Sequence, residues 1–198
     1  GRVKDSGLMA QRPFRSPHHT ISNVALVGGG SYPQPGEISM SHNGVLFLDE
    51  LPEFKREVLE VMRQPLEDRE VTISRAKFTV TYPSSFMLVA SMNPIPSGYF
   101  NDPDAPVTSS PAEMQRYLSK VSGPLLDRID IHIEVPRIEN QALFNDTTEG
   151  ESSEIIRQRV YQAFLQQQKR GPRGNADLTV KEIEALCTLR TKVLVLLE

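Results

Sequence analysis

The seven residues from Gly44 to Glu50 constrain the fold of the chain more than any other stretch. Four apolar residues, 45–48, run without interruption and end in two adjacent carboxylates, Asp49 and Glu50. Such a run is typical of a strand covered on both faces in a parallel sheet, and the Asn-Gly pair before it favours a strand over a buried helix. The two acids would then lie at the carboxyl end of the strand, where open α/β sheets bind ligands.

This acid pair has two interpretations. In P-loop NTPases, a carboxylate at this position holds Mg²⁺, directly or through water, and a neighbouring carboxylate can orient or deprotonate a water molecule. The alternative is a strand that ends in a solvated acidic turn, because short apolar runs followed by acids are common. The stretch by itself leaves both interpretations open.

The bulk composition excludes several classes of protein. A chain of 198 residues fits one domain, with or without a small appendage. Its net charge of −3 gives no global electrostatic case for nucleic acid, so any such contact would be local. The single cysteine, Cys187, excludes an intramolecular disulfide and fits a reducing cytoplasm. No stretch reaches the roughly 18 apolar residues of a membrane span, so we expect a cytoplasmic protein without a membrane partner.

Two elements are expected between the acid pair and residue 82. Apolar residues at helical spacing predict a helix that begins near Pro52 and ends near Pro65. Alternating residues over 71–82 predict a β-hairpin with its tip at 74–77. The cations Arg75 and Lys77 at this tip could contact a phosphate backbone, and a solvated turn is the alternative.

Further polar residues follow or precede predicted strands. An apolar strand over 86–90 is followed by Asn93, which could bind the same water or phosphate as the acid pair if the two strands are neighbours. The alternation over 129–135 predicts an edge strand with one polar face. Arg128 directly precedes it, in the fixed position that an arginine finger needs, and a salt bridge to Asp127, Asp130 or another local acid is the alternative.

Two N-terminal features give weaker signals. His18 and His19 would face opposite ways in a strand, so hydrogen-bonded structural histidines are favoured over a metal pair. The run Gly28–Gly30 lacks the Lys-Ser/Thr of a P-loop and is interpreted as a flexible hinge in an insertion.

Near the other end of the chain, two helices are expected. Ser152 or Ser153 and the capping box Thr179–Glu182 predict where they begin.

Taken together, these motifs resemble the AAA+ core of the magnesium-chelatase-like ATPase family of the ComM/YifB type. The segments that carry the resemblance are 12–20, 35–54, 63–68, 92–94 and 123–130. The resemblance implies an α/β fold, part of an AAA+ parallel-sheet core with helix-2 and pre-sensor-1 β-hairpin insertions, over residues 1–138. A linker over 139–150 and the start of a helical lid over 151–198 would follow.

The resemblance also implies roles for individual residues. Asp49 would be the Walker B acid for Mg²⁺, Glu50 the catalytic glutamate that polarises the attacking water, and Asn93 the sensor of the γ-phosphate. Arg128 would reach the nucleotide of a neighbouring subunit, and the 71–82 hairpin would face the pore of a hexameric ring. ATP and Mg²⁺ are the implied cofactors. In ComM-like proteins the implied activity is branch migration on DNA during natural transformation, whereas chelatase relatives drive metal insertion into a porphyrin.

Two departures from the family pattern limit these implications. No Gly-x-x-x-x-Gly-Lys-Ser/Thr motif occurs in the sequence, so we expect the Walker A loop upstream of Gly1 and no tight ATP binding by this chain alone. A second sensor arginine is likewise expected beyond Glu198. Many relatives carry two Cys-x-Cys pairs after Met-Asn-Pro, and no zinc is expected here because those positions hold other residues, namely Ile95, Ser97, Val107 and Ser109.

Four functions therefore remain in competition. The favoured one is part of an ATP-driven ring motor that acts on DNA, and the first alternative is a chelatase-type motor that acts on a protein partner. A non-enzymatic interaction domain with a decayed nucleotide site is disfavoured because the acid pair, Asn93 and Arg128 are intact. A metallohydrolase built on the acid pair with His18 or His19 lacks a typical ligand spacing. An exposed apolar face is expected where a P-loop strand would pack.

Overall fold

The computed structural model describes residues 11–93, 110–135, 150–171 and 174–186. The chain divides into two units, residues 1–134 and 135–198, and each is described by itself below. The predicted linker, except Gly150, lies outside the described residues, as do Cys187 and the four positions discussed for zinc.

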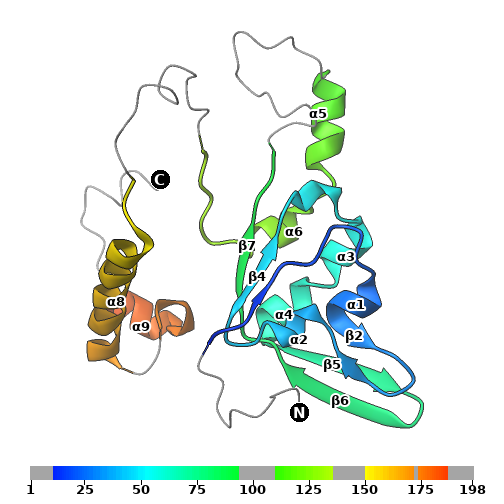
Figure 1. Cartoon of the computed structure of the whole chain (residues 1–198), viewed down its shortest axis with the longest axis horizontal. Coiled ribbons are helices and arrows are strands. Elements are labelled where there is room, and N and C mark those ends of the chain that lie inside the picture. Colours follow the sequence, from blue (N-terminus) through cyan, green and yellow to red (C-terminus); the bar gives the residue numbers. More distant parts are fainter. Residues whose placement is uncertain (1–10, 94–109, 136–149, 172–173, 187–198) are drawn as a thin grey trace. The chain divides into compact units, whose positions relative to one another are not determined.

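Among its described residues, the first unit is built on a parallel sheet of three strands (Figure 1). Strand β4 (Val45–Leu48) lies between β1 (Phe14–Arg15) and β7 (Met87–Ala90), and it is parallel to both. The register pairs Val45 with Met87 and Leu48 with Ala90, so β4 and β7 end at the same edge. The predicted α/β fold with a parallel sheet is therefore confirmed, and the apolar run 45–48 is its central strand.

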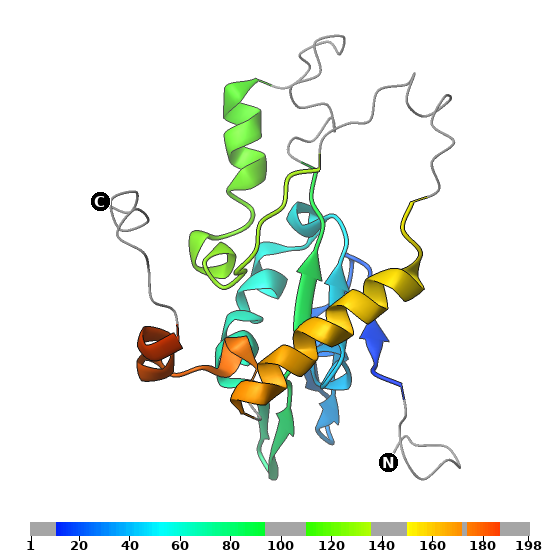
Figure 2. The same ribbon diagram turned by 90° about the vertical axis from the view of Figure 1, so that its left-hand side faces the viewer.

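One face of this sheet is packed against helices, and the other is exposed. Leu46 and Leu48 are fully buried, and they pack in the hydrophobic core with side chains of the helices that follow β4. On the other face, Phe14 and Met87 are each 64% exposed. Figure 2 shows the helices after β4 gathered on one side of β4 and β7. The sequence predicts cover on both faces, but the described residues of this unit cover only one.

Three short helices follow β4 where the sequence predicts one. They are the 3₁₀ helix η1 (Leu51–Glu53), α3 (Arg56–Glu60) and α4 (Arg63–Asp68). Pro65 explains the break, because proline has no N–H to donate and its ring clashes with the carbonyl of the fourth residue before it in a continuous helix. It is tolerated in the first turn of α4, where N–H groups have no partner within the helix.

Two antiparallel hairpins extend from this core. Helix α1 (Asn23–Val27) leads into the first, which pairs β2 (Gly28–Gly29) with β3 (Gln34–Pro35) and is followed by α2 (Glu37–Met40). The second pairs β5 (Glu70–Arg75) with β6 (Phe78–Pro83) and confirms the hairpin predicted over 71–82. Gly28 and Gly29 thus form a strand of a hairpin and Gly30 begins its turn, where a hinge is expected from the sequence. A β-hairpin between strands β4 and β7 is the insertion that the resemblance implies.

Residues 110–134, all of which the structure describes, contain two helices and no further strand. Helix α5 (Pro111–Leu118) begins with a complete capping box between Ser110 and Glu113, and α6 (Gly123–Leu126) follows. The edge strand predicted over 129–135 is not formed. A strand requires a partner, but β7 pairs only with β4 among the described residues, and Ile133 is 80% exposed.

The second unit contains the two helices predicted near the end of the chain. Helix α8 (Ser153–Arg170) begins at Ser152, whose side chain accepts a hydrogen bond from the Ile155 N–H. The 3₁₀ helix η2 (Asn175–Asp177) follows it, and α9 (Val180–Leu186) begins with the predicted pairing of Thr179 and Glu182. No helix in the described part of the chain is long and apolar enough to cross a membrane.

Candidate functional site

The acid pair lies where two neighbouring strands end. Beyond the paired residues of the sheet, the Ser91 N–H donates to the Leu48 carbonyl at 3.0 Å, and the Leu51 N–H donates to the Ser91 carbonyl at 2.9 Å. These two bonds hold the segments after β4 and β7 together. Asp49 and Glu50 therefore occupy a fixed position at the carboxyl edge of the sheet, as the sequence predicts.

Two hydrogen bonds orient the Asp49 carboxylate. Its Oδ1 atom accepts from the Ser91 hydroxyl and from the Glu50 main-chain N–H, the latter at 3.1 Å. In the part of the chain that the structure describes, its Oδ2 atom has no hydrogen-bond partner. One carboxylate oxygen is thus engaged by the protein, and the other is available to a cation or to the water of a hydrated cation.

Glu50 adopts an unusual backbone conformation. Its φ of 54° and ψ of 52° lie in the left-handed region, which non-glycine residues adopt at a cost of about 1–3 kcal/mol and which is concentrated at functional sites. Its side chain is 52% exposed, and its Oε2 atom lies 3.6 Å from Nδ1 of His19. The Glu50 carboxylate is therefore within reach of water and adjacent to an imidazole.

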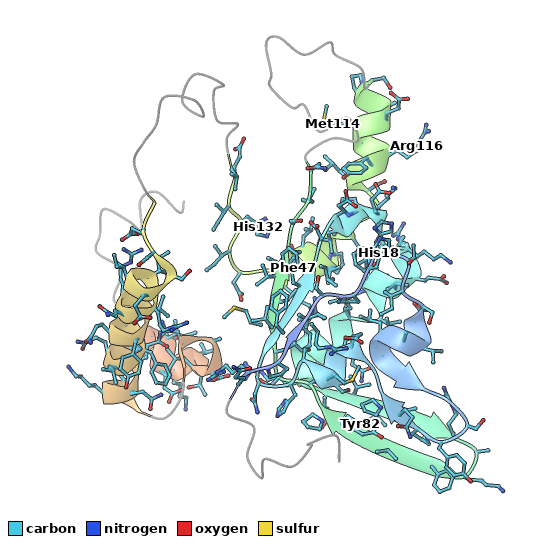
Figure 3. All side chains as sticks on the ribbon, in the orientation of Figure 1. His18, Phe47, Tyr82, Met114, Arg116 and His132 are labelled. Atoms are coloured by element: carbon cyan, nitrogen blue, oxygen red, sulfur yellow. The ribbon has the colours of Figure 1, made fainter. Side chains whose placement is uncertain are left out.

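The two adjacent histidines lie against each other. The ring centroids of His18, which is labelled in Figure 3, and His19 are 4.0 Å apart. Neither residue is in a strand, because β1 ends at Arg15. The strand in which they would face opposite ways is therefore not formed at these two residues. Thr20 hydrogen bonds to Nδ1 of His18, as expected for a structural histidine. The described residues contain no group of three or more His, Cys, Asp or Glu side chains that could hold a metal ion.

Helix α5 adds a buried tyrosine next to the acids. Tyr117 is 6% exposed, and burial raises the pKa of its hydroxyl, with smaller contributions from the carboxylates of Glu53 and Glu50. The Lys120 ammonium lies 3.5 Å from the Glu53 carboxylate and 5.3 Å from the centre of the Tyr117 ring. The surroundings of the acid pair are thus partly buried and contain a cation near Glu53.

Three of these neighbours were missed by sequence reasoning. Ser91 could have been found, because it directly follows its strand as Asp49 follows the neighbouring strand. His19 was considered as a structural histidine or a metal ligand and not as a neighbour of Glu50, although it precedes Thr20 at the end of a segment that resembles the family. Tyr117 could not have been found, because no pattern in the sequence indicates that α5 lies close to the residues that follow β4.

Asn93 lies two residues beyond Ser91 and is exposed. Since the register places Ser91 beside Asp49, the side chain that contacts the acid pair is a serine and not Asn93. Within the described residues, no hydrogen bond joins Asn93 to either acid. Its role as a sensor stays a prediction.

Arg128 is held by a helix of the same chain. Its Nη2 atom donates to Oε2 of Glu67 in α4 at 2.5 Å, and its Nη1 atom donates to the Pro124 carbonyl at 2.8 Å. This hydrogen bond lowers the pKa of the Glu67 carboxyl. Arg128 also lines a cavity of about 480 Å³ together with residues of α4 and β5. It does not contact the acid pair in the described structure, so its role on a neighbouring subunit's nucleotide also stays a prediction.

The two cations predicted to contact DNA lie at the end of the β5–β6 hairpin. Arg75 donates from Nε to the Gly30 carbonyl at 3.2 Å and from Nη1 to the Ser74 carbonyl at 2.9 Å. Lys77 lies in the two-residue turn and is exposed. Arg75 is thus partly used to join the two hairpins, whereas the ammonium of Lys77 is open to solvent.

Comparison with known proteins identifies the family. A family model described as "Magnesium chelatase, subunit ChlI" matches residues 1–143, and the chain belongs to this family. Its relatives include the competence protein ComM of Haemophilus influenzae, which is 50% identical over 92% of this chain, and YifB of Escherichia coli, which is 47% identical over 92%. The resemblance inferred from the motifs is therefore confirmed.

The matched relatives are longer than this chain. The chain covers 35% of the length of ComM and 36% of that of YifB. Among solved structures, NtrX from Brucella abortus in complex with ADP is similar over 61% of this chain and 24% of its own length, with a TM-score of 0.41 and 18% sequence identity.

Proposed function

We propose that the protein to which this chain belongs is an AAA+ ATPase that uses Mg²⁺-dependent ATP hydrolysis in a hexameric ring to act on DNA. The observation that carries the proposal is the acid pair at the carboxyl edge of a parallel sheet, with Asp49 oriented by Ser91. Ligands bind at this edge in open α/β sheets, and adjacent acids there suit phosphoryl transfer to water. A cytoplasmic location is part of the same proposal.

The residues present fit a magnesium ion in part. Asp49 offers one carboxylate oxygen that no described residue uses, and carboxylate oxygen is a ligand that Mg²⁺ prefers. When bound through Asp49, Mg²⁺ would neutralise charge on the phosphate oxygens. The 198 residues contain no Walker A motif, so the proposal assigns tight ATP binding to the full-length protein.

The proposal gives each residue of the site a task. Glu50, exposed and at the strand end, orients a water molecule and accepts its proton at a carboxylate oxygen. The Asn93 amide donates a hydrogen bond to the γ-phosphate. Arg128 leaves Glu67 and reaches the phosphates of a neighbouring subunit, where an arginine finger typically accelerates hydrolysis by about 10³- to 10⁵-fold.

Two observations favour different substrates for the motor. A relative that is 50% identical is named a competence protein, and the cations Arg75 and Lys77 lie at an exposed hairpin end, which favours DNA. The matching family model is described as a magnesium chelatase subunit, which favours a protein partner. We favour DNA because cations on an exposed hairpin suit a phosphate backbone.

ATP hydrolysis by the full-length protein, with and without branched DNA, tests the proposal. We expect DNA to stimulate turnover, and we expect Lys77→Ala to weaken this stimulation in a salt-dependent way while basal turnover is retained. Basal turnover that no DNA stimulates would favour the motor that acts on a protein. Absence of turnover under all conditions would favour a decayed nucleotide site.

A matched pair of variants tests the role of Arg128. Arg128→Ala should lose turnover and be partly rescued in rings mixed with wild-type subunits, since wild-type subunits supply the arginine to their neighbours. Glu67→Gln breaks the same ion pair from the other side and should keep turnover. Equal turnover in Arg128→Ala and wild type would contradict an arginine finger.

A further inference from the structure

The two hairpins of the first unit are joined by hydrogen bonds and by a contact between two aromatic rings. Tyr82 Oη donates to the Pro33 carbonyl at 2.9 Å, and Arg75 Nε donates to the Gly30 carbonyl at 3.2 Å. At their ends, the rings of Tyr32 and Phe78 lie 5.7 Å apart at 38°. Figures 1 and 2 show β2 and the β5–β6 hairpin running side by side to a common end.

The glycine run permits this close approach. A Cβ atom at Gly28 would lie 2.4 Å from the Gln34 carbonyl oxygen and 2.6 Å from Cδ1 of Ile73, and one at Gly29 would lie 2.9 Å from Nη2 of Arg75. The backbone of the first hairpin can therefore lie directly on β5. As a result, side chains of two segments about 45 residues apart in the sequence form one surface.

This surface, which we call the aromatic tip, consists of Tyr32, Arg75, Lys77 and Phe78. Tyr32 is 72% exposed and Phe78 is 44% exposed, so each ring keeps accessible area after their mutual contact. The register places Arg75 directly across from Phe78, and Lys77 occupies the turn. The contributing segments, 28–34 and 74–79, contain two cations and no acid.

We propose that the aromatic tip binds single-stranded DNA, with a base stacked on Tyr32 and a phosphate bound by Lys77. Every base offers a π-face, and aromatic rings beside cations on a local basic surface are the features that bind single strands without sequence readout. The proposal rests on the proposed action on DNA and adds which residues make the contact, in which form of DNA, and by which interaction. Phe78 supports the Tyr32 ring, and Arg75 holds the two hairpins together.

Equilibrium binding of the full-length protein to a fluorescein-labelled 30-nucleotide oligo(dT) tests the proposal. Tyr32→Leu keeps an apolar side chain against Phe78 but removes the stacking face, and it should weaken binding about tenfold. Tyr32→Trp should bind at least as tightly as wild type. The control Tyr161→Leu replaces a ring in α8 that is 56% exposed and stacked on Phe164, and it should bind as wild type.

The salt dependence separates stacking from charge. Lys77→Ala removes one phosphate contact and should reduce the slope of log affinity against log salt by about 0.7, the value per phosphate for single strands. Tyr32→Leu should leave this slope unchanged, because the tyrosine carries no charge. Circular dichroism melting of each variant verifies that the fold is kept, which we expect because the Tyr32 side chain is mostly exposed.

The possible failures are distinguishable. If wild-type protein binds the oligonucleotide and Tyr32→Leu binds equally well, the stacking proposal is overturned and the action on DNA stands. If Tyr32→Trp weakens binding as much as Tyr32→Leu, the ring serves only to pack the two hairpins, and the proposal is also overturned. If wild-type protein binds neither this oligonucleotide nor branched DNA, the proposed function itself fails.

Discussion

His19 and Glu50 are brought together by the register of the sheet. Strands β1 and β4 pair Arg15 with Leu46, and His19 and Glu50 each lie four residues further along their segments. Nδ1 of His19 and Oε2 of Glu50 are 3.6 Å apart. The candidate catalytic carboxylate thus lies beside His19, in the segment that follows the adjacent parallel strand, and the imidazole can restrain its orientation.

Replacing His19 should therefore affect the rate and not the binding of ATP. For His19→Ala in the full-length protein, we expect kcat to fall by roughly tenfold with little change in KM, since misplacing a catalytic group by about 1 Å can cost up to 10²-fold. Steady-state ATPase kinetics measure both constants. A change confined to KM would show that His19 contributes to nucleotide binding and does not position Glu50.

Removing the charge of Glu50 should abolish turnover. A positioned base contributes about 10²- to 10⁴-fold, so Glu50→Gln should hydrolyse ATP slower by that factor while it still binds ATP. The matched control is Glu53→Gln, which alters an exposed carboxylate that pairs with Lys120 and has no proposed part in the chemistry. Comparable turnover in Glu50→Gln and wild type would remove Glu50 from the mechanism.

The Ser91 hydroxyl should matter for magnesium. Ser91→Ala removes a hydrogen bond that orients Asp49, and loss of such a supporting contact typically costs about 10- to 100-fold in metal affinity or activity. We expect a corresponding rise in the Mg²⁺ concentration that gives half-maximal turnover. Ser91→Thr keeps the hydroxyl and should restore much of the wild-type dependence, whereas a merely structural role would not distinguish the two variants in this way.

The ion pair between Arg128 and Glu67 should give a pH-dependent contribution to stability. The hydrogen bond from Arg128 lowers the pKa of Glu67 below its ordinary value of 4.5 in the folded chain. The pair therefore stabilises the fold above pH 4.5, and the contribution is lost as the pH falls through the lowered pKa. The Glu67 side chain is 64% exposed, so we expect the contribution to be small.

Urea unfolding of this chain from pH 7 to pH 3 measures the effect. The difference between wild type and Glu67→Gln should be present at neutral pH and shrink towards zero in acid. Glu57→Gln serves as the control, because Glu57 is exposed and forms no ion pair within the described residues. A difference that grows in acid would have the wrong sign for this ion pair.

A methyl group at Gly28 should disturb both hairpins. Gly28 has a φ of +114°, and a Cβ atom there would lie far inside contact distance of Gln34 and Ile73. We expect Gly28→Ala to lower the free energy of unfolding by about 1–3 kcal/mol. Gly123→Ala is a matched control, since a Cβ atom at that position meets nothing within 4 Å, and it should be close to neutral.

Local patterns in the sequence were sufficient to predict much of this fold. The apolar run before Asp49, the alternation over 71–82 and the capping residues Ser152 and Thr179 each depend on neighbours in the chain, and the structure forms the strand, hairpin and helices that they predict. The break in the helix after β4 was missed because Pro65 was taken as the end of a helix and not as the first turn of the next.

The features that sequence reasoning predicted wrongly or missed depend on residues that are distant in the sequence. The strand predicted over 129–135 requires a neighbouring strand, which the described residues do not provide. The contacts of Asp49 with Ser91 and of Glu50 with His19 depend on which strands are neighbours and in which register. The Gly28–Gly30 run appeared flexible because its packing against Ile73 and Arg75 is set by a hairpin more than 40 residues away.

The joined hairpins also have a mechanical consequence. An isolated two-stranded hairpin bends easily about its base, whereas two ribbons fastened to each other must stretch or compress their backbones in order to bend. Here Tyr82, near the base of the second hairpin, and Arg75, near its end, both donate to the turn of the first hairpin, so a bend of the second hairpin must displace the first. A load applied at the outer end is therefore transmitted to both attachments, α1 through the first hairpin and α4 through the second.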